Sequence, residues 1–229
     1  MSETHASKAL ALALVGAPIL WLGAEAVSPK LDQAAGDQLK VIAAHQDRWY
    51  GYTMLLALGT MLLVPAIAGI VRLTRERSTR LTYLGAALLG FGTLVAIGDA
   101  TTQLVVWQMV GPKADRSQMA ALLDRFDNAG GAGVFFGPGG IAFLVGTLLL
   151  SVAMVRTPEL PRWAAVLFGV GLIVQLVGFS ASSVPIIAVS GVLSLASMAA
   201  IARSLLGVSA ESAHRATARP GIGAQTVPS

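Results

Sequence analysis

One carboxylate lies within a long apolar stretch of the sequence. In residues 81–110, Asp99 is the single charged side chain. About 20 apolar residues are enough to cross a membrane as a helix, and a carboxylate at the centre of such a helix costs about 2.5–3.5 kcal/mol on insertion scales. Thr102 and Gln103 follow Asp99 at helical spacing and share its face. Asp99 lies roughly 27 Å along the helix from Leu81, so we predict a functional site in the outer part of the membrane.

A second carboxylate, Glu25, stands near the end of the first apolar stretch, residues 9–27. Two carboxylates whose environments separate their pKa values can act as an acid and a base. The catalytic residues would therefore be Asp99 and Glu25 if the protein is an enzyme. We predict no cofactor and no metal site, because His45 is the only histidine outside the terminal tails and protein metal sites usually cluster several ligands.

The composition points to a membrane protein. Of the 229 residues, 55% are hydrophobic and 12% are charged, and the mean hydropathy is +0.70. Soluble domains carry about 25% charged residues. The net charge of +4 does not indicate nucleic-acid binding, because the basic residues fall at the ends of apolar stretches, where membrane topology places them. No cysteine is present, which excludes disulfides and thiolate chemistry.

These stretches predict an all-α integral membrane protein with a bundle of six transmembrane helices. The predicted spans are about 9–27, 49–71, 81–110, 130–155, 163–182 and 185–206. We expect residues 1–8 to form a cytoplasmic leader and residues 208–229 a disordered cytoplasmic tail, because the tail is small and polar.

Two segments outside the central spans have further interpretations. Met119, Leu122, Leu123 and Phe126 recur at helical spacing and predict a short amphipathic helix in the third loop. The first apolar stretch ends in Ala-Glu-Ala at residues 24–26, as a signal peptide does. Its length favours a retained helix, and cleavage stays open as the alternative.

The distribution of Lys and Arg sets the orientation. Ten basic residues fall on the face that holds both termini and the second and fourth loops, and six fall on the other face. Cytoplasmic loops are enriched in Lys and Arg. We therefore predict an N-in/C-in topology. The Ala-, Gly- and Leu-rich composition resembles that of many small multi-span proteins of bacteria with high-GC genomes, which favours the bacterial cytoplasmic (inner) membrane.

The first half of the fourth span is unusually rich in glycine. Pro138 and the surrounding glycines predict a kinked or broken helix, which membranes tolerate where the backbone lines a cavity. Gly133 and Gly137 form a GxxxG pair, which favours close helix packing in a homo-oligomer or with a membrane partner. Ser190, Ser194 and Ser197 in the sixth span share a face that we assign to helix packing.

The predicted topology brings the uncommon polar residues to the outer end of the bundle, around an outward-facing polar cavity. The predicted ligand-binding residues are Asp99, Gln103, Thr102, His45, Asp47, Arg48, Tyr50 and Asn128. The structural alternative is that Asp99 pairs with an arginine or bonds to Tyr50 and Thr53, because charges inside membranes are usually paired.

Three functions are compatible with this cavity. The first is binding of a small amphiphilic or lipid-like molecule, with Asp99 and Arg48 fixing its polar end. The second is a membrane-embedded enzyme that uses Glu25 and Asp99 for isomerisation or isoprenoid cyclisation of a lipophilic substrate. The third is an accessory subunit of a membrane complex.

Overall fold

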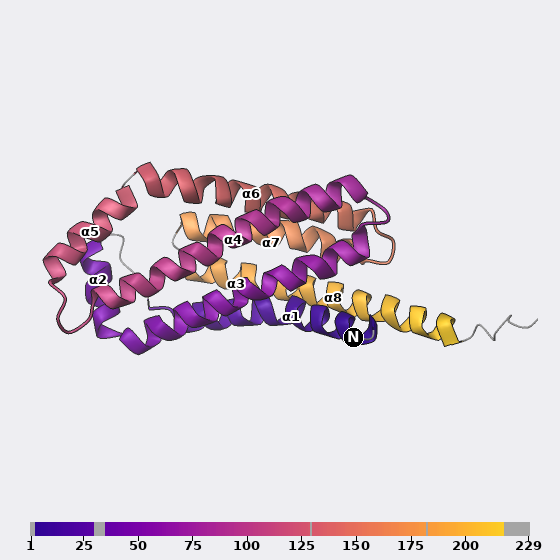
Figure 1. Cartoon of the computed structure of the whole chain (residues 1–229), viewed down its shortest axis with the longest axis horizontal. Coiled ribbons are helices and arrows are strands. Elements are labelled where there is room, and N and C mark those ends of the chain that lie inside the picture. The colour runs from indigo at the N-terminus through magenta and orange to yellow at the C-terminus, as the bar shows by residue number, and fades with distance from the viewer. Residues whose placement is uncertain (1–2, 30–34, 129, 182, 218–229) are drawn as a thin grey trace, which may run out of the picture.

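The computed structural model describes residues 3–29, 35–128, 130–181 and 183–217, and this part of the chain contains helices and no strand (Figure 1). The helices are α1 Glu3–Val27, α2 Ala35–Ala44, α3 Gln46–Thr74, α4 Thr79–Met109, α5 Arg116–Asn128, α6 Gly130–Val155, α7 Arg162–Ser180 and α8 Val184–Thr217.

Six of these helices are long and apolar enough to cross a membrane. The candidate spans are His5–Val27, Gln46–Thr74, Thr79–Met109, Gly133–Val155, Arg162–Ser180 and Val184–Glu211. The prediction of an all-helical fold is confirmed for the described residues. The prediction of six spans is confirmed in the sense that six helices have the length and apolar composition of a membrane span. The two remaining helices, α2 and α5, are short, and α5 is the amphipathic helix expected in the third loop.

One boundary prediction was wrong. The chain does not leave the helix after residue 206, because α8 continues to Thr217. A glycine such as Gly207 costs a helix about 1 kcal/mol but does not by itself end it, and the following residues include good helix formers. The fourth span was predicted to be kinked or broken, and the break is not observed, since α6 is one continuous helix with Pro138 inside it.

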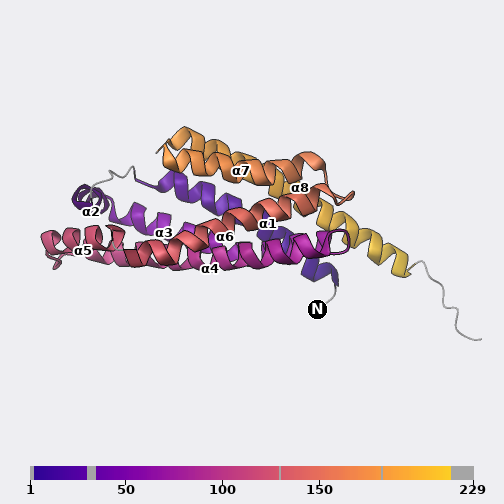
Figure 2. The same cartoon turned by 90° about the horizontal axis from the view of Figure 1, so that it is seen from above.

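The six spanning helices close into a ring that follows chain order. Helix α1 packs on α3, α3 on α4, α4 on α6, α6 on α7 and α7 on α8, and α8 returns to pack on α1. Seen from above, α7 and α8 form one side of the bundle and α4 the other (Figure 2). A ring of six helices can be solid or hollow, depending on the side chains that point to its centre.

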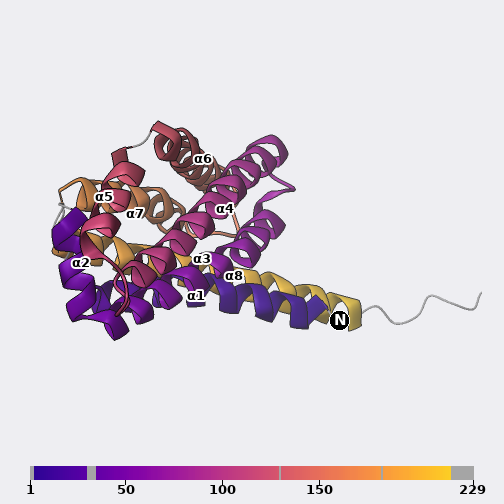
Figure 3. The ribbon, with the colours of Figure 1, turned by 60° about the vertical axis from the view of Figure 1, so that its left-hand side comes forward.

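The two ends of the bundle differ. We call the end with the N-terminus, the α3–α4 and α6–α7 connections and the C-terminal part of α8 the basic end (Figure 1). We call the opposite end, where α2 and α5 lie, the capped end (Figure 3). Six arginines flank the α3–α4 and α6–α7 connections: Arg72, Arg75, Arg77, Arg80, Arg156 and Arg162.

Toward the basic end the ring is filled by apolar side chains. A single buried cluster joins all six spanning helices there, and Leu14, Leu150 and Ile201 in it are completely inaccessible to solvent. Several buried hydroxyl groups in this region have hydrogen-bond partners nearby, whereas the buried Ser78 hydroxyl has none among the described residues. The buried Ser197 hydroxyl donates to the Ala164 carbonyl at 2.8 Å, and that of Thr82 donates to Thr74 at 3.0 Å.

Helices α4 and α6 approach closely at glycines. A Cβ at Gly146 would collide with the backbone of Leu89, and one at Gly92 would collide with the backbone of Phe143. Close approach of this kind needs small residues at the contact. A Cβ at Gly133 or Gly137 would meet no atom within 4 Å, so these two glycines do not mediate close packing within the described part of the chain, and their role in association with a second molecule stays a prediction.

The capped end has its own apolar cluster. Residues from α2, the start of α3, the end of α4 and α5 form it, with Ile42, Trp49 and Leu123 among its buried members. Asp115 caps α5, since its carboxylate accepts hydrogen bonds from the backbone of Ser117 at 2.9 Å and of Gln118 at 3.3 Å. The cap contacts α3, α4 and α6, and the described residues of α2 and α5 do not contact α1, α7 or α8.

Candidate functional site

A cavity of about 420 Å³ lies inside the ring, and all six spanning helices line it. Each helix contributes a stripe with the spacing of one helical face. On α6 the stripe is Phe136, Gly139, Gly140, Phe143 and Leu144. Comparable stripes run along α1 (Pro18, Trp21, Leu22, Glu25), α3 (Tyr52, Leu56, Thr60), α4 (Gly92, Val95, Ala96, Asp99), α7 (Leu172, Gln175, Leu176, Phe179) and α8 (Ile187, Ser190, Gly191, Ser194).

The direction of each helix orders these residues into layers. Helices α1, α4 and α7 run toward the capped end, and α3, α6 and α8 run away from it. The layer nearest the capped end therefore contains Glu25, Tyr52, Asp99, Phe136, Phe179 and Ile187. We call these six residues the outer layer. Both carboxylates of the cavity belong to it.

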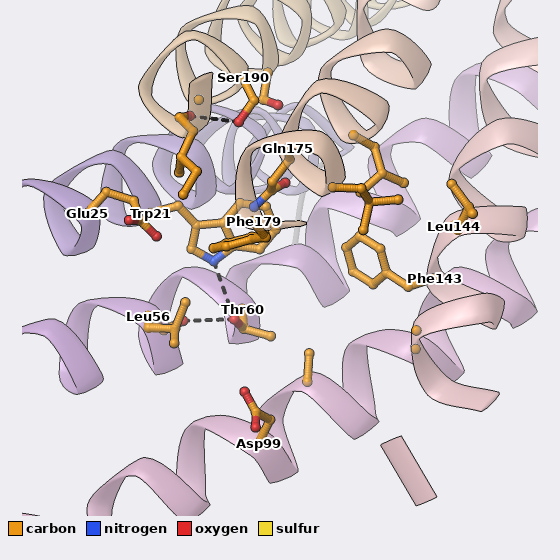
Figure 4. A pocket seen from close by; sticks show the side chains of 18 of the residues that line it. Trp21, Glu25, Leu56, Thr60, Asp99, Phe143, Leu144, Gln175, Phe179 and Ser190 are labelled. Carbon is orange, nitrogen blue, oxygen red and sulfur yellow. Dashed lines mark hydrogen bonds between the residues drawn. The ribbon is translucent and has the colours of Figure 1, made fainter. Parts of the chain in front are cut away.

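Glu25 and Asp99 face the same space from different helices. Figure 4 shows the Glu25 side chain entering the cavity from α1 and that of Asp99 entering from α4. Glu25 is half-buried and Asp99 is exposed to the cavity. Tyr52 lies within electrostatic range of both carboxyl groups. Within the described part of the chain, neither carboxylate has a hydrogen-bond or ion-pair partner.

The polar groups deeper in the cavity are already bonded within the protein. The Trp21 indole donates to the Thr60 hydroxyl at 3.3 Å, and Thr60 donates to the Leu56 carbonyl at 2.8 Å (Figure 4). The Ser190 hydroxyl donates to the Ile187 carbonyl at 2.7 Å. These bonds lower the capacity of the deep cavity to bind polar groups. The Gln175 amide is the remaining polar side chain at this depth.

The structure brings one residue of the predicted ligand-binding set, Asp99, to the cavity, together with Glu25. Thr102 and Gln103 continue the α4 helix beyond the cavity. The Thr102 hydroxyl donates to the Asp99 carbonyl at 2.7 Å, and the Gln103 carbonyl accepts from the Trp49 indole at 3.2 Å. Both groups therefore stabilise the capped end.

The other predicted residues lie on the surface of the capped end. His45 and Asp47 are exposed at the start of α3. Arg48 donates to the Val27 carbonyl at 3.2 Å, where a cation stabilises the C-terminus of α1. The Tyr50 ring packs on Trp107, with ring centroids 5.2 Å apart.

Asn128 ends α5 and donates to the Asp124 carbonyl and carboxylate at 2.9 and 3.1 Å. Five residues that were predicted to bind the ligand are therefore not among the lining residues of the cavity. They are His45, Asp47, Arg48, Tyr50 and Asn128. The structural alternative for Asp99 is also not observed. Tyr50 faces Trp107, and the Thr53 hydroxyl donates to the Trp49 carbonyl at 2.9 Å.

Several lining residues were missed by sequence reasoning. Tyr52 and Trp21 line the cavity, although the sequence analysis assigns no ligand-binding role to either residue. Ser190, Ser194 and Ser197 were assigned to helix packing. Ser197 packs in the buried core, Ser194 lies against Gly171 of α7, and Ser190 and Ser194 also line the cavity, which was not predicted. Gln175 could have been predicted from the sequence, because it is the most polar residue inside its apolar span.

Metal binding has no support in the described residues, where no group of three His, Cys, Asp or Glu side chains could hold an ion. The fold is consistent with the class of multi-pass membrane proteins, because six of its helices are long and apolar enough to cross a membrane. A scan against models of known families finds no match, and comparisons with curated proteins and with solved structures find no significant similarity.

Proposed function

We propose that this protein binds a small amphiphilic or lipid-like molecule in the cavity of the ring. The supporting observation is the cavity itself, which is enclosed by six helices and lined mainly by apolar side chains, with both of its carboxylates in the outer layer. Small-molecule sites typically occupy about 300–1,000 Å³ and combine an apolar lining with few polar groups. The volume of about 420 Å³ lies in this range.

The position of the carboxylates suits an amphiphile. Glu25 and Asp99 each lie roughly 30 Å along their helices from the basic end, at about 1.5 Å per residue. A hydrocarbon core is about 30 Å thick. With the basic end at the cytoplasmic boundary, both carboxylates reach the outer boundary and avoid the cost of a charge at the membrane centre. The polar end of the ligand would then face outward and its apolar part inward.

Gly140 offers a direct test of occupancy. It is central in the α6 stripe, and a Cβ there meets no atom within 4 Å, so a leucine side chain would fill the cavity. Gly140→Leu should retain the fold and lose any co-purified molecule in native mass spectrometry from mild detergent. Gly90→Leu is the matched control, because Gly90 also faces open space but does not line the cavity. Equal occupancy in both variants would overturn the proposal.

A membrane-embedded enzyme is the second proposal, supported by two carboxylates that line one cavity. One carboxyl would donate a proton to an alkene of a lipophilic isoprenoid, and the other would remove a proton from the resulting cation, giving an isomer or a cyclic product. The test is product analysis with a linear isoprenoid for the wild type, Glu25→Gln and Asp99→Asn. Equal turnover by all three proteins would remove this function.

The remaining expectations are also proposals. We propose that the protein lies in the bacterial cytoplasmic membrane with both ends inside, since the basic end carries the arginine-rich connections. Association through Gly133 and Gly137, as a homo-oligomer or an accessory subunit, is supported by the open space around both glycines. The mass of the purified protein would show whether residues 1–26 are retained, and a co-purified polypeptide would support the accessory role.

A further inference from the structure

We propose that the ligand of this cavity is a cationic amphiphile, such as a lipophilic amine or quaternary ammonium compound. This inference rests on the proposed binding function and adds the charge of the ligand. Its basis is the joint arrangement of acidic and aromatic side chains around a cavity with an apolar interior.

The charges of the lining have one sign. Among the described residues, 24 line the cavity; two of them are ionisable acids, Glu25 and Asp99, and none of them is Lys, Arg or His. The basic residue that was expected to hold an anionic headgroup, Arg48, does not line the cavity and instead bonds to the Val27 carbonyl. An anionic headgroup would therefore meet two like charges and no counter-charge, which costs free energy in a poorly solvated site.

The two carboxylates also lack a partner within the protein. Among the described residues no side chain donates a hydrogen bond to Glu25 or Asp99 or pairs with either in a salt bridge. Charges at membrane depth are usually paired with one another, with backbone groups or with a ligand. A bound cation would supply the missing counter-charge for both groups at once.

Aromatic rings stand between the acids. In the outer layer, Tyr52 lies on the helix between those of Glu25 and Asp99, and Phe136 and Phe179 follow on the next two helices of the ring. Trp21 lies one helical turn deeper than Glu25, and Phe143 lies two turns deeper than Phe136 (Figure 4). Cations bind over aromatic faces, and quaternary ammonium groups are recognised by several rings together. The same layer therefore offers both kinds of group that attract a lipophilic cation.

The apolar part of such a ligand has a defined place. Below the outer layer the cavity is lined by Leu56, Val95 and Leu172, among others, and the hydroxyls of Thr60 and Ser190 are already bonded inside the protein. A hydrocarbon chain can fill most of this region. Among the described residues the Gln175 amide is the polar side chain there that such a chain would leave without a hydrogen-bond partner.

The experiment compares three amphiphiles with the same ten-carbon chain: decyltrimethylammonium, decanol and decanoate. Binding to the protein in lipid nanodiscs is measured by calorimetry, and the Gly140→Leu protein supplies the correction for partition into lipid. We expect decyltrimethylammonium to bind at least about tenfold more tightly than decanol, and decanoate to bind most weakly.

Variants of the two acids test whether Glu25 and Asp99 cause the preference for the cationic amphiphile over decanol. The double variant Glu25→Gln, Asp99→Asn should lose the tenfold preference for the cation over decanol. Its thermal unfolding in detergent, compared with that of the wild type, shows whether it is folded. Asp47→Asn is the matched control, because Asp47 is an exposed acid of the capped end outside the cavity. It should leave the preference unchanged.

The outcomes separate the two proposals. Equal binding of the cation and decanol, or a preference that survives the double variant, would overturn the cationic ligand and leave the amphiphile-binding function standing. Tighter binding of decanoate would overturn it in the same way. If none of the three compounds binds more strongly to the wild type than to Gly140→Leu, both proposals fail.

Discussion

The two halves of the helical ring are built from the same six helices and differ in what fills them. In the half next to the basic end, leucine, isoleucine and methionine side chains meet in a continuous buried cluster. In the half next to the capped end, some positions that line the cavity are glycine or serine, including Gly140, where a Cβ would meet no atom within 4 Å, and Ser194. The helices do not have to move apart to make a cavity, because short side chains leave the space open.

This difference assigns separate roles to the two halves. Tight packing and van der Waals contact hold helices together inside a membrane, where lipid is as apolar as the protein interior. The packed half supplies this contact, and the hollow half is held at the capped end by the α2–α5 cluster. A cavity in one half is compatible with stability because the other half is solid.

The largest expected effect is on the stability of the packed half. Leu150→Ala should lower the free energy of unfolding by about 2–3 kcal/mol, since Leu150 is fully buried against α4. We expect the lower part of the range for such changes because lipid, not water, is the alternative environment. Leu176→Ala, at a 43% exposed cavity position, should cost less than about 1 kcal/mol.

Thermal unfolding in detergent, with calibration by denaturant, measures both variants. Similar losses of stability in Leu150→Ala and Leu176→Ala would show that the two halves contribute equally, and the division into a packed and a hollow half would be wrong.

The next effect concerns access from water. The chain has no cysteine, so single cysteines can be introduced without a background. Ser194→Cys lies in the cavity and should react with a membrane-impermeant maleimide added from the side of the capped end. Ser197→Cys lies on the same helix in the packed half, where Ser197 is fully buried, and should stay unlabelled. Equal labelling of the two variants would contradict the distinction between a hollow half that water reaches and a packed half that it does not.

The smallest effect is expected at the cap. Hydrogen bonds from the Ser117 hydroxyl, and from the backbone N–H groups of Gln118 and Ser117, lower the pKa of the exposed Asp115 carboxyl. A lowered folded-state pKa stabilises the helix start above the unfolded pKa of about 3.9, and this stabilisation is lost as the pH falls through the folded value. Acidification below about pH 4 should therefore loosen the start of α5 and leave the packed half unchanged.

Hydrogen exchange, corrected for its intrinsic pH dependence, measures this local loosening. Asp115→Asn should remove the pH response while it retains a cap, and Asp115→Ala should loosen the start of α5 at every pH. A pH response that persists in Asp115→Asn would assign the effect to another group.

Much of the fold was visible in the sequence. Long apolar stretches give six spanning helices wherever the backbone must satisfy its own hydrogen bonds in lipid, and the spacing of Met119 and Phe126 predicted α5. The end of α8 was not predictable from Gly207, because a single glycine is a weak signal against a strong helical context. The glycines that pack, Gly92 and Gly146, do not form the expected local motif, because close approach depends on the partner helix.

The sequence by itself determined that six stretches are apolar enough to span a membrane, that Glu25 and Asp99 are the acids within these stretches, and that the basic residues are unevenly distributed. Each of these properties depends on one segment and its solvent. Only the tertiary structure decided which polar residues share a site. It placed Tyr52 beside both acids and left His45, Arg48 and Asn128 on the surface. The physical reason is that the rotation and depth of each helix are set by its contacts with neighbouring helices, which no single segment encodes.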